Sequence, residues 1–223
     1  FFIGDVRDYK RLVHALRDVD IVVHAAALKH VPATEYNPSE CINTNVLGAQ
    51  NIIDASLSGD SSVKKVIAIS TDKAVNPINI YGASKLAADK LFISSNNFKG
   101  KKNIKFSIVR YGNVFESRGS VIPYFIELKK IGKKSFPITD LKMTRFFIPI
   151  EDGIKHVVNS IYNCQGGEIF IPKMPSLKVT DLARAIDANI KFNVIGIRPG
   201  EKLHETLISK DNQDKIVEYK NYY

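Results

Sequence analysis

Apolar runs and segments of helical periodicity alternate along the first half of the chain. The apolar runs, which have no regular alternation with polar residues, are residues 20–27, 63–70 and 105–110. Strands buried on both faces give such continuous runs. The segments with apolar residues at helical spacing are residues 9–16, 40–58 and 81–94. This order of strand and helix predicts an α/β fold with a mostly parallel sheet and helices on both of its faces.

The rhythm changes after Asn113, where short strands, a helix over residues 121–131 and frequent prolines follow. We therefore predict a domain boundary near residue 115. Residues 1–115 would form the doubly wound parallel sheet. Residues 116–223 would form a smaller mixed lobe, with some segments returning to the core sheet.

The start of the chain lacks an element that dinucleotide-binding sheets use. Such sheets begin with a strand, a Gly-rich turn and a helix whose N-terminus holds the pyrophosphate. This sequence opens instead on what would be a third strand, residues 1–4, followed by Asp5. We expect an N-terminally truncated Rossmann-like sheet, preceded in the parent protein by roughly 50–60 residues, or two strand–helix units.

Composition narrows the class of protein. Hydrophobic residues make up 44% and charged residues 25%, which is typical of a soluble globular protein. Cys41 and Cys164 lie far apart, and the five histidines show no metal-ligand spacing, so we expect neither a disulfide scaffold nor a metal site. No apolar run approaches the roughly 20 residues of a membrane span. These features predict a cytoplasmic protein that does not contact a membrane.

The net charge of +9 raises the question of an anionic partner. The lysines are spread along the chain, and the one dense cluster, at residues 99–102, reads as a helix-to-strand loop. No arginine-rich or aromatic-interleaved motif for nucleic acid is present. We expect a solvated basic surface that also attracts phosphorylated ligands, and no nucleic-acid partner.

The strongest chemical signal is a tyrosine and a lysine, Tyr81 and Lys85, at the start of a predicted helix. Their spacing places both on one helix face. An adjacent ammonium lowers the pKa of a phenol, which would make Tyr81 a general base toward a sugar hydroxyl. Thr71, at the end of the preceding strand, could bond the same substrate oxygen. A helix start with a solvent-facing lysine is the plainer interpretation, but the order of strand, Ser70-Thr71, turn and helix favours the chemical one.

Several motifs together resemble the extended short-chain dehydrogenase/reductase family. They are Asp5-Val6-Arg7-Asp8, His24-Ala25-Ala26-Ala27, Asn43-Thr44-Asn45, Ser70-Thr71 and Tyr81-x-x-x-Lys85. The resemblance implies a tightly bound and recycled NADP or NAD. The residues that it assigns to this cofactor are Asp5, Val6, Ala25, Ala26, Ala27, Asn45, Tyr81 and Lys85. Asn45 would also support the active-site helix. Tight strand packing is the alternative for the alanines, and helix capping is the alternative for Asn45.

The residues after Thr71 narrow the resemblance. Retaining sugar 4,6-dehydratases of this family carry an Asp-Glu pair there and 4-epimerases carry none, whereas this chain has Asp72-Lys73. This resembles the inverting UDP-N-acetylglucosamine 4,6-dehydratases. Further stretches that support it are residues 27–32, 143–147 and 198–205. In that chemistry Lys73 would take the C5 proton and Asp72 would protonate the C6 hydroxyl. The alternative is an ordinary surface pair in a strand-to-helix loop.

The same resemblance suggests residues for the UDP-sugar. Asn113 resembles a diphosphate-contacting asparagine, and the guanidinium groups of Arg145 and Arg198 match phosphate oxygens. Glu201 could hold a ribose hydroxyl, and Lys29 could touch the substrate. A surface charge or turn residue is the alternative for each of them.

The leading hypothesis is therefore a hydro-lyase of nucleotide sugars, a C5-inverting UDP-N-acetylglucosamine 4,6-dehydratase that begins the biosynthesis of pseudaminic-type sugars. The rival hypotheses are a UDP-sugar 4-epimerase that uses the same Tyr81 and Lys85, and a non-catalytic or inactive fragment on this fold. By the same resemblance we expect a homo-oligomer.

Overall fold

A four-stranded parallel sheet lies at the centre of the computed structural model, which describes residues 1–223. In spatial order its strands are β1 (Ile21–His24), β2 (Lys65–Thr71), β3 (Lys105–Tyr111) and β7 (Ile169–Phe170). Because every pair is parallel, all carboxyl ends of the strands meet at one edge of the sheet. Sites of doubly wound sheets are built at this edge.

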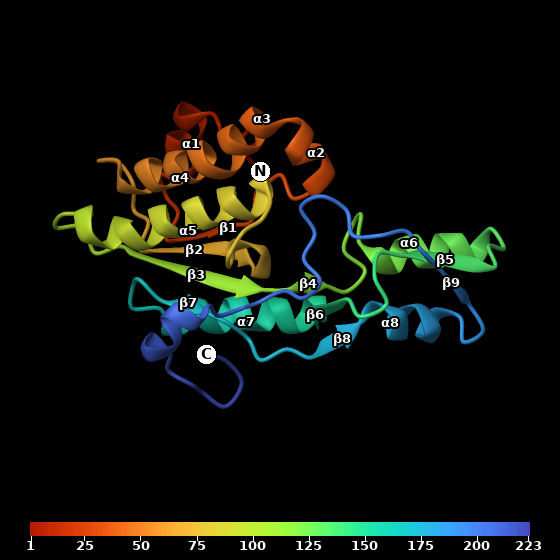
Figure 1. The fold of residues 1–223 in the computed structure, drawn as a ribbon. Helices are drawn as coiled ribbons and strands as arrows, with labels where there is room; N and C mark the ends of the chain where they lie inside the picture. Colours follow the sequence, from red (N-terminus) through yellow and green to blue (C-terminus); the bar gives the residue numbers. More distant parts are fainter.

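Helices cover both faces of the sheet, which confirms the predicted α/β class (Figure 1). The helices of one face are α1 (Tyr9–Ala15), α4 (Gly48–Leu57) and α5 (Ile80–Phe98). Helix α7 (Ile150–Asn163) lies on the other face. Side chains that alternate along the strands supply both cores: Val66 points to the cluster under α4 and α5, and its neighbour Ile67 points to the cluster under α7.

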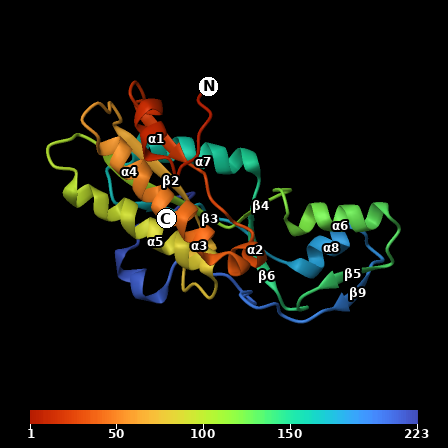
Figure 2. The ribbon, with the colours of Figure 1, turned by 90° about the horizontal axis from the view of Figure 1, so that it is seen from above.

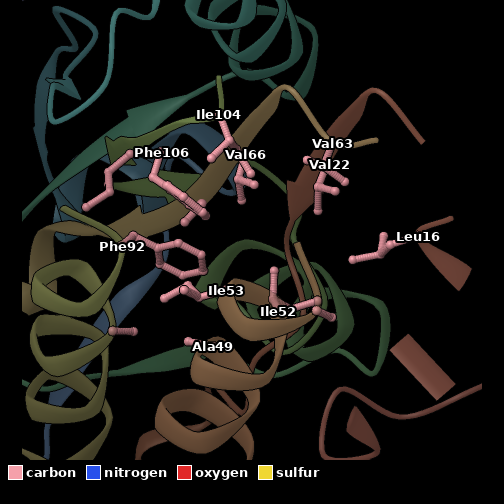
Figure 3. Close-up of a cluster of buried hydrophobic side chains, with 14 residues drawn as sticks. Leu16, Val22, Ala49, Ile52, Ile53, Val63, Val66, Phe92, Ile104 and Phe106 are labelled. Atoms are coloured by element: carbon pink, nitrogen blue, oxygen red, sulfur yellow. The ribbon is translucent and has the colours of Figure 1, made fainter. Parts of the chain in front are cut away.

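The larger core fills the space between the sheet and helices α4 and α5 (Figure 3). Phe92 of α5 and Ile53 of α4 are fully buried there against Phe106 and Val66 of the strands. Truncating such an aromatic side chain to alanine costs about 3–5 kcal/mol. This core therefore holds α5, the helix that carries the tyrosine–lysine pair, firmly against the sheet.

Three predicted elements differ from the structure. Residues 1–4 form no strand, because they are exposed and lie beside no partner strand that could complete their backbone hydrogen bonds. The predicted strand 20–27 ends at His24 because Ala25, Ala26 and Ala27 leave the sheet. The predicted helix 40–58 is divided into α3 (Pro38–Ile42), a π-helical segment (Asn43–Leu47) and α4, and a short helix α2 (Val31–Tyr36) precedes them. A π-helical turn is wider than an α-helical one and is frequent at functional sites.

A smaller lobe extends from the carboxyl edge of the sheet (Figure 2). Its elements are α6 (Val121–Lys130), α8 (Val179–Ile186) and the parallel strands β5 (Ser135–Ile138) and β9 (Lys191–Val194). It has its own core, in which Phe125 stacks on Phe136. A three-stranded sheet of β4 (Asn113–Val114), β6 (Thr144–Ile148) and β8 (Ser176–Lys178) lies between this lobe and the main sheet.

Residues 116–223 therefore do not all belong to the lobe. Helix α7 and strand β7 return to the main sheet, and a 3-10 helix (Lys210–Lys215) lies near the C-terminus. The segment after β9 crosses from the lobe to the carboxyl edge of the main sheet. There the Asn79 amide donates to the Gly200 carbonyl at 2.7 Å, and Arg110 donates to the Leu207 carbonyl at 3.2 Å.

Candidate active site

The carboxyl end of β2 runs directly into a tight 3-10 turn, Asp72–Ala74. Thr71 caps this turn: its Oγ1 accepts from the Lys73 backbone N–H at 3.3 Å and donates to Asp72 Oδ1 at 3.0 Å. The Asp72 side chain is completely buried. Its second oxygen, Oδ2, has no hydrogen-bond partner. A buried carboxylate oxygen without a partner is rare and costly, and it is a mark of functional sites.

Lys73 extends from the same turn into a cluster of oxygen atoms. Its Nζ lies 3.0 Å from Asp72 Oδ1, 3.4 Å from Asn113 Oδ1 and 3.6 Å from Glu205 Oε1. The structure thus places Asn113, predicted as a substrate contact, beside the predicted acid–base pair. At the carboxyl edge of the sheet Asp72 is buried and the Lys73 side chain is 21% exposed, so the two do not form an ordinary surface pair.

Helix α5 brings Tyr81 to this turn. Asn79 caps the helix, since its Oδ1 accepts from the Gly82 backbone N–H at 2.7 Å. Gly82 allows the close approach, because a Cβ at this position would lie 2.3 Å from the Lys73 carbonyl oxygen. Tyr81 is buried, and the Thr71 side chain lies beside it. Thr71, Asp72, Lys73 and Tyr81 therefore lie together, as the sequence predicts.

The electrostatics of the Tyr81–Lys85 pair differ from the expectation. Burial raises the pKa of Tyr81 above its ordinary value; the adjacent Thr71 side chain lowers it in part, and the charge of Asp72 raises it further. Burial also lowers the pKa of Lys85, whose Nζ donates to the Ile69 carbonyl at 2.7 Å. Lys85 is thus directed to the end of β2, and the predicted lowering of the Tyr81 pKa by its ammonium is wrong for the protein alone.

The carboxyl end of β1 leaves an open backbone surface. Ala25 and Ala26 are exposed, so the alternative of tight strand packing is wrong for them. Asn45 lies in the π-helical segment; its side chain bonds both the N–H and the C=O of Leu28, at 2.8 and 2.9 Å, and donates to Ser84 Oγ at 2.9 Å. Asn45 thereby braces the loop after β1 against α5, which is a tertiary contact and not a helix cap.

The residues predicted for the adenine lie further along this edge. Asp5 is held by a bidentate pair with Arg7, at 2.9 and 3.0 Å, and the Arg7 hydrogen bonds lower its pKa to about 2. The Val6 carbonyl accepts a hydrogen bond from the Asn51 side-chain amide at 3.0 Å, and the Val6 side chain packs on Gly48. A nicotinamide dinucleotide fits this edge as far as the chain provides it. Ala25 and Ala26 offer exposed backbone and small side chains on which a flat ring can lie.

The other predicted substrate residues are only partly brought together. Arg145 is buried and donates to the carbonyls of Thr144, Lys202 and Leu203 at 2.7–3.1 Å. It therefore holds the segment after β9 and points its donors at backbone oxygens. Arg198 is exposed and forms an ion pair with Glu201. Lys29 is exposed on the loop after β1.

Two pairs of charged residues were missed by the sequence reasoning. Glu205, on the segment after β9, pairs with Lys73, and Lys202 pairs with Glu205. Their place within Arg198-Pro199-Gly200-Glu201-Lys202-Leu203-His204-Glu205 was the only available signal. Asp89 of α5 and Arg110 of β3 form a second buried pair at 3.0 Å behind Tyr81 and Lys85. No sequence signal pointed to that second pair.

Other site types are not found. No group of three or more histidine, cysteine or acidic side chains is arranged to hold a metal ion. No helix has the length and apolar character that a membrane span requires.

Comparison with known proteins places this geometry in context. The profile described as polysaccharide biosynthesis protein matches residues 1–223. A UDP-N-acetylglucosamine 4,6-dehydratase (inverting) from Campylobacter jejuni is 58% identical over all 223 residues, which cover 66% of its length. A UDP-glucose 4-epimerase from Rickettsia akari is 44% identical, with 100% of this chain and 66% of that protein covered. The chain therefore spans slightly less than two thirds of these relatives.

Among solved structures, Pen from Bacillus thuringiensis superposes with a TM-score of 0.93 at 39% identity. The match covers 99% of this chain and 69% of that one. This similarity confirms the Rossmann-like doubly wound fold over almost the whole chain.

Proposed function

Because the chain belongs to the polysaccharide biosynthesis protein family, we propose that it carries the catalytic part of a C5-inverting UDP-N-acetylglucosamine 4,6-dehydratase. The observation that carries the proposal is the pair of a buried Asp72 and a partly buried Lys73 beside Thr71 and Tyr81. The name of the 58% identical Campylobacter jejuni relative supports the same activity.

The reaction requires an acid and a base on adjacent sugar carbons. A ketone at C4 makes the C5 proton acidic, and water leaves when a base takes that proton and an acid protonates the C6 hydroxyl. Lys73 is the base, since its Nζ is the amine that lies beside Asp72. Asp72 is the acid, since it is the carboxyl group paired with Lys73 and its Oδ2 has no hydrogen-bond partner within the protein. Each group must first reach its neutral form in this water-poor site.

The C4 oxidation needs a proton acceptor and a hydride acceptor. Tyr81, which lies beside Thr71, takes the proton of the C4 hydroxyl. When bound, a nicotinamide cofactor supplies reversible hydride acceptance and, in its oxidised form, a positive charge that favours a phenolate. Ala25, Ala26 and Lys85 would hold its nicotinamide half. Lys85 uses one of its three donors on Ile69 and keeps two for a ribose. We further propose that this cofactor is NADP and not NAD.

The phosphate groups of UDP need cationic partners. Arg198 and Lys29 are exposed near the carboxyl edge and would bind these phosphate groups. Glu201 holds Arg198 in place through an ion pair. Arg145 contributes indirectly, by ordering the backbone of residues 202–203. We extend the proposal to a homo-oligomeric enzyme that acts in the cytoplasm. The two free cysteines, Cys41 and Cys164, agree with the cytoplasmic location.

A single experiment tests the proposal. The full-length gene product is incubated with UDP-N-acetylglucosamine and NADP in deuterated water, and NMR follows C5 and C6. We expect deuterium at an inverted C5 and a new C6 methyl group. In Lys73→Ala we expect C4 oxidation without loss of water, at least about 100-fold slower product formation, and in the exposed control Lys155→Ala normal product. An epimer at C4 with an intact C6 hydroxyl would instead establish the epimerase activity named for the Rickettsia relative.

A further inference from the structure

Lys73 has a second buried carboxylate beside it, on a segment distant in sequence. Glu205 Oε1 lies 3.6 Å from Lys73 Nζ, and Glu205 Oε2 lies 3.4 Å from Lys202 Nζ. The Glu205 side chain is only 3% exposed. Lys202 also donates to the Val75 carbonyl at 2.6 Å, just after the turn that carries Lys73. The segment after β9 thus supplies a carboxylate and an ammonium to the candidate acid–base pair.

The four side chains form a row of alternating charge: Asp72, Lys73, Glu205 and Lys202. Two carboxylates and two ammonium groups give the row no net formal charge. Coulomb interactions between neighbours in the row are strong, because the side chains are largely removed from water. A change in the charge of one member therefore changes the protonation balance of the next.

The proposed reaction needs the first two members in their neutral forms. Transfer of a proton from Lys73 Nζ to Asp72 Oδ1, across 3.0 Å, breaks an N–H bond and forms an O–H bond. The result is a free amine and a carboxylic acid, the base and the acid of water loss. Glu205 opposes this transfer, since its charge stabilises the ammonium form of Lys73. Lys202 offsets Glu205 by attracting its other oxygen.

We propose that Glu205 and Lys202 are positioning residues that set the proton balance of the Asp72–Lys73 pair. This inference rests on the proposed dehydratase function. Neither residue has to touch the substrate: Glu205 acts through Lys73, and Lys202 acts through Glu205.

The neighbouring titratable groups do not alter the direction of these effects. Tyr81 of α5 and Tyr111 of β3 are neutral at physiological pH, since the ordinary pKa of a tyrosine is 10.0 and burial raises it further. Arg145 of β6 bonds backbone carbonyls of the same segment, and His204 bonds Thr144. Neither Arg145 nor His204 forms an ion pair with a carboxylate of the row.

The test is the pH dependence of kcat/KM for water loss, measured on the full-length gene product. The pH at half of the maximal rate, on the acid side, should fall by about one unit in Glu205→Gln, because an adjacent opposite charge shifts a titration by about 1–3 units. In Lys202→Gln the same midpoint should rise. Glu205→Asp retains the charge and should stay near the wild-type midpoint. Lys155→Gln removes one partner of an exposed surface ion pair and is the control, in which the midpoint should not shift.

A purely structural role would have a different signature. If Glu205 and Lys202 only fasten the segment to β2, the variants lower the melting temperature and the rate, and the midpoints stay in place or move in the same direction. Either result overturns the inference. Failure of the proposed function is separate: it appears in the wild-type protein, as a product without a C6 methyl group, before any variant is compared.

Discussion

At the scale of single residues, His24 at the end of β1 is the most strongly perturbed histidine. It is buried against Phe92, with ring centroids 5.6 Å apart. Burial, followed by the charge of Lys85, lowers its pKa to about 4. In the folded protein the residue therefore stays neutral well below its ordinary pKa of 6.5.

This pKa predicts how stability depends on pH. Since the folded pKa is below the unfolded one, the unfolded state binds more protons between pH 6.5 and 4. The contribution of His24 is complete above pH 6.5 and is lost as pH falls toward 4. Between pH 7 and 5 the loss is about 2 kcal/mol. In urea unfolding, His24→Leu should lose less stability over this interval than the wild type. The exposed His14→Leu should match the wild type, and an equal loss in all three proteins would contradict the assignment.

At the scale of elements, the contact between α5 and the turn after β2 decides the geometry of the site. The backbones meet at Gly82, where there is no room for a side chain because the Lys73 carbonyl lies opposite. Tyr81 is the residue before this contact. The position of its hydroxyl beside Thr71 therefore depends on a glycine that takes no part in the chemistry.

We predict that Gly82→Ala forces α5 away from the turn. The added Cβ would lie 2.3 Å from a backbone oxygen, which cannot move aside as a flexible side chain can. Overpacking of this kind costs about 1–3 kcal/mol, and turnover should fall at least about 100-fold because Tyr81 is displaced. Gly59→Ala, where the added Cβ has no neighbour within 4 Å, is the matched control. Equal melting temperatures and turnover for the two variants would refute the close-contact argument.

At the scale of the whole molecule, the segment after β9 connects the small lobe to the main sheet at the site itself. Arg145 of β6 holds this segment through the Lys202 and Leu203 carbonyls. Asn79 and Arg110 hold it from the main sheet through Gly200 and Leu207. Backbone hydrogen bonds therefore hold this segment on both sides, next to the candidate acid–base pair.

We predict that Arg145→Lys loosens residues 200–207, because an ammonium cannot reproduce the planar set of guanidinium donors. Hydrogen exchange of these amides should become at least about 5-fold faster, which corresponds to about 1 kcal/mol. Turnover should fall with it, while Arg184→Lys, on the exposed face of α8, should change neither. Unchanged exchange together with weaker UDP binding would favour a direct phosphate contact for Arg145.

The sequence by itself determined the alternation of strands and helices in the first half of the chain, and it singled out the local candidate site residues. Buried strands and amphipathic helices show their periodicity directly, and Thr71, Asp72, Lys73 and Tyr81 lie within eleven positions around one strand–turn–helix unit. Local geometry alone brings such residues together, so their proximity could be predicted.

Only the tertiary structure decided the rest. Glu205 reaches Lys73, and Lys202 reaches the Val75 carbonyl, across more than a hundred residues, through a segment without regular structure, which no local pattern encodes. Burial, which raises the pKa of Tyr81 and directs Lys85 to Ile69, likewise depends on how the layers pack. Helix spacing gives the distance along one element, whereas desolvation and charge pairing depend on which other elements surround it.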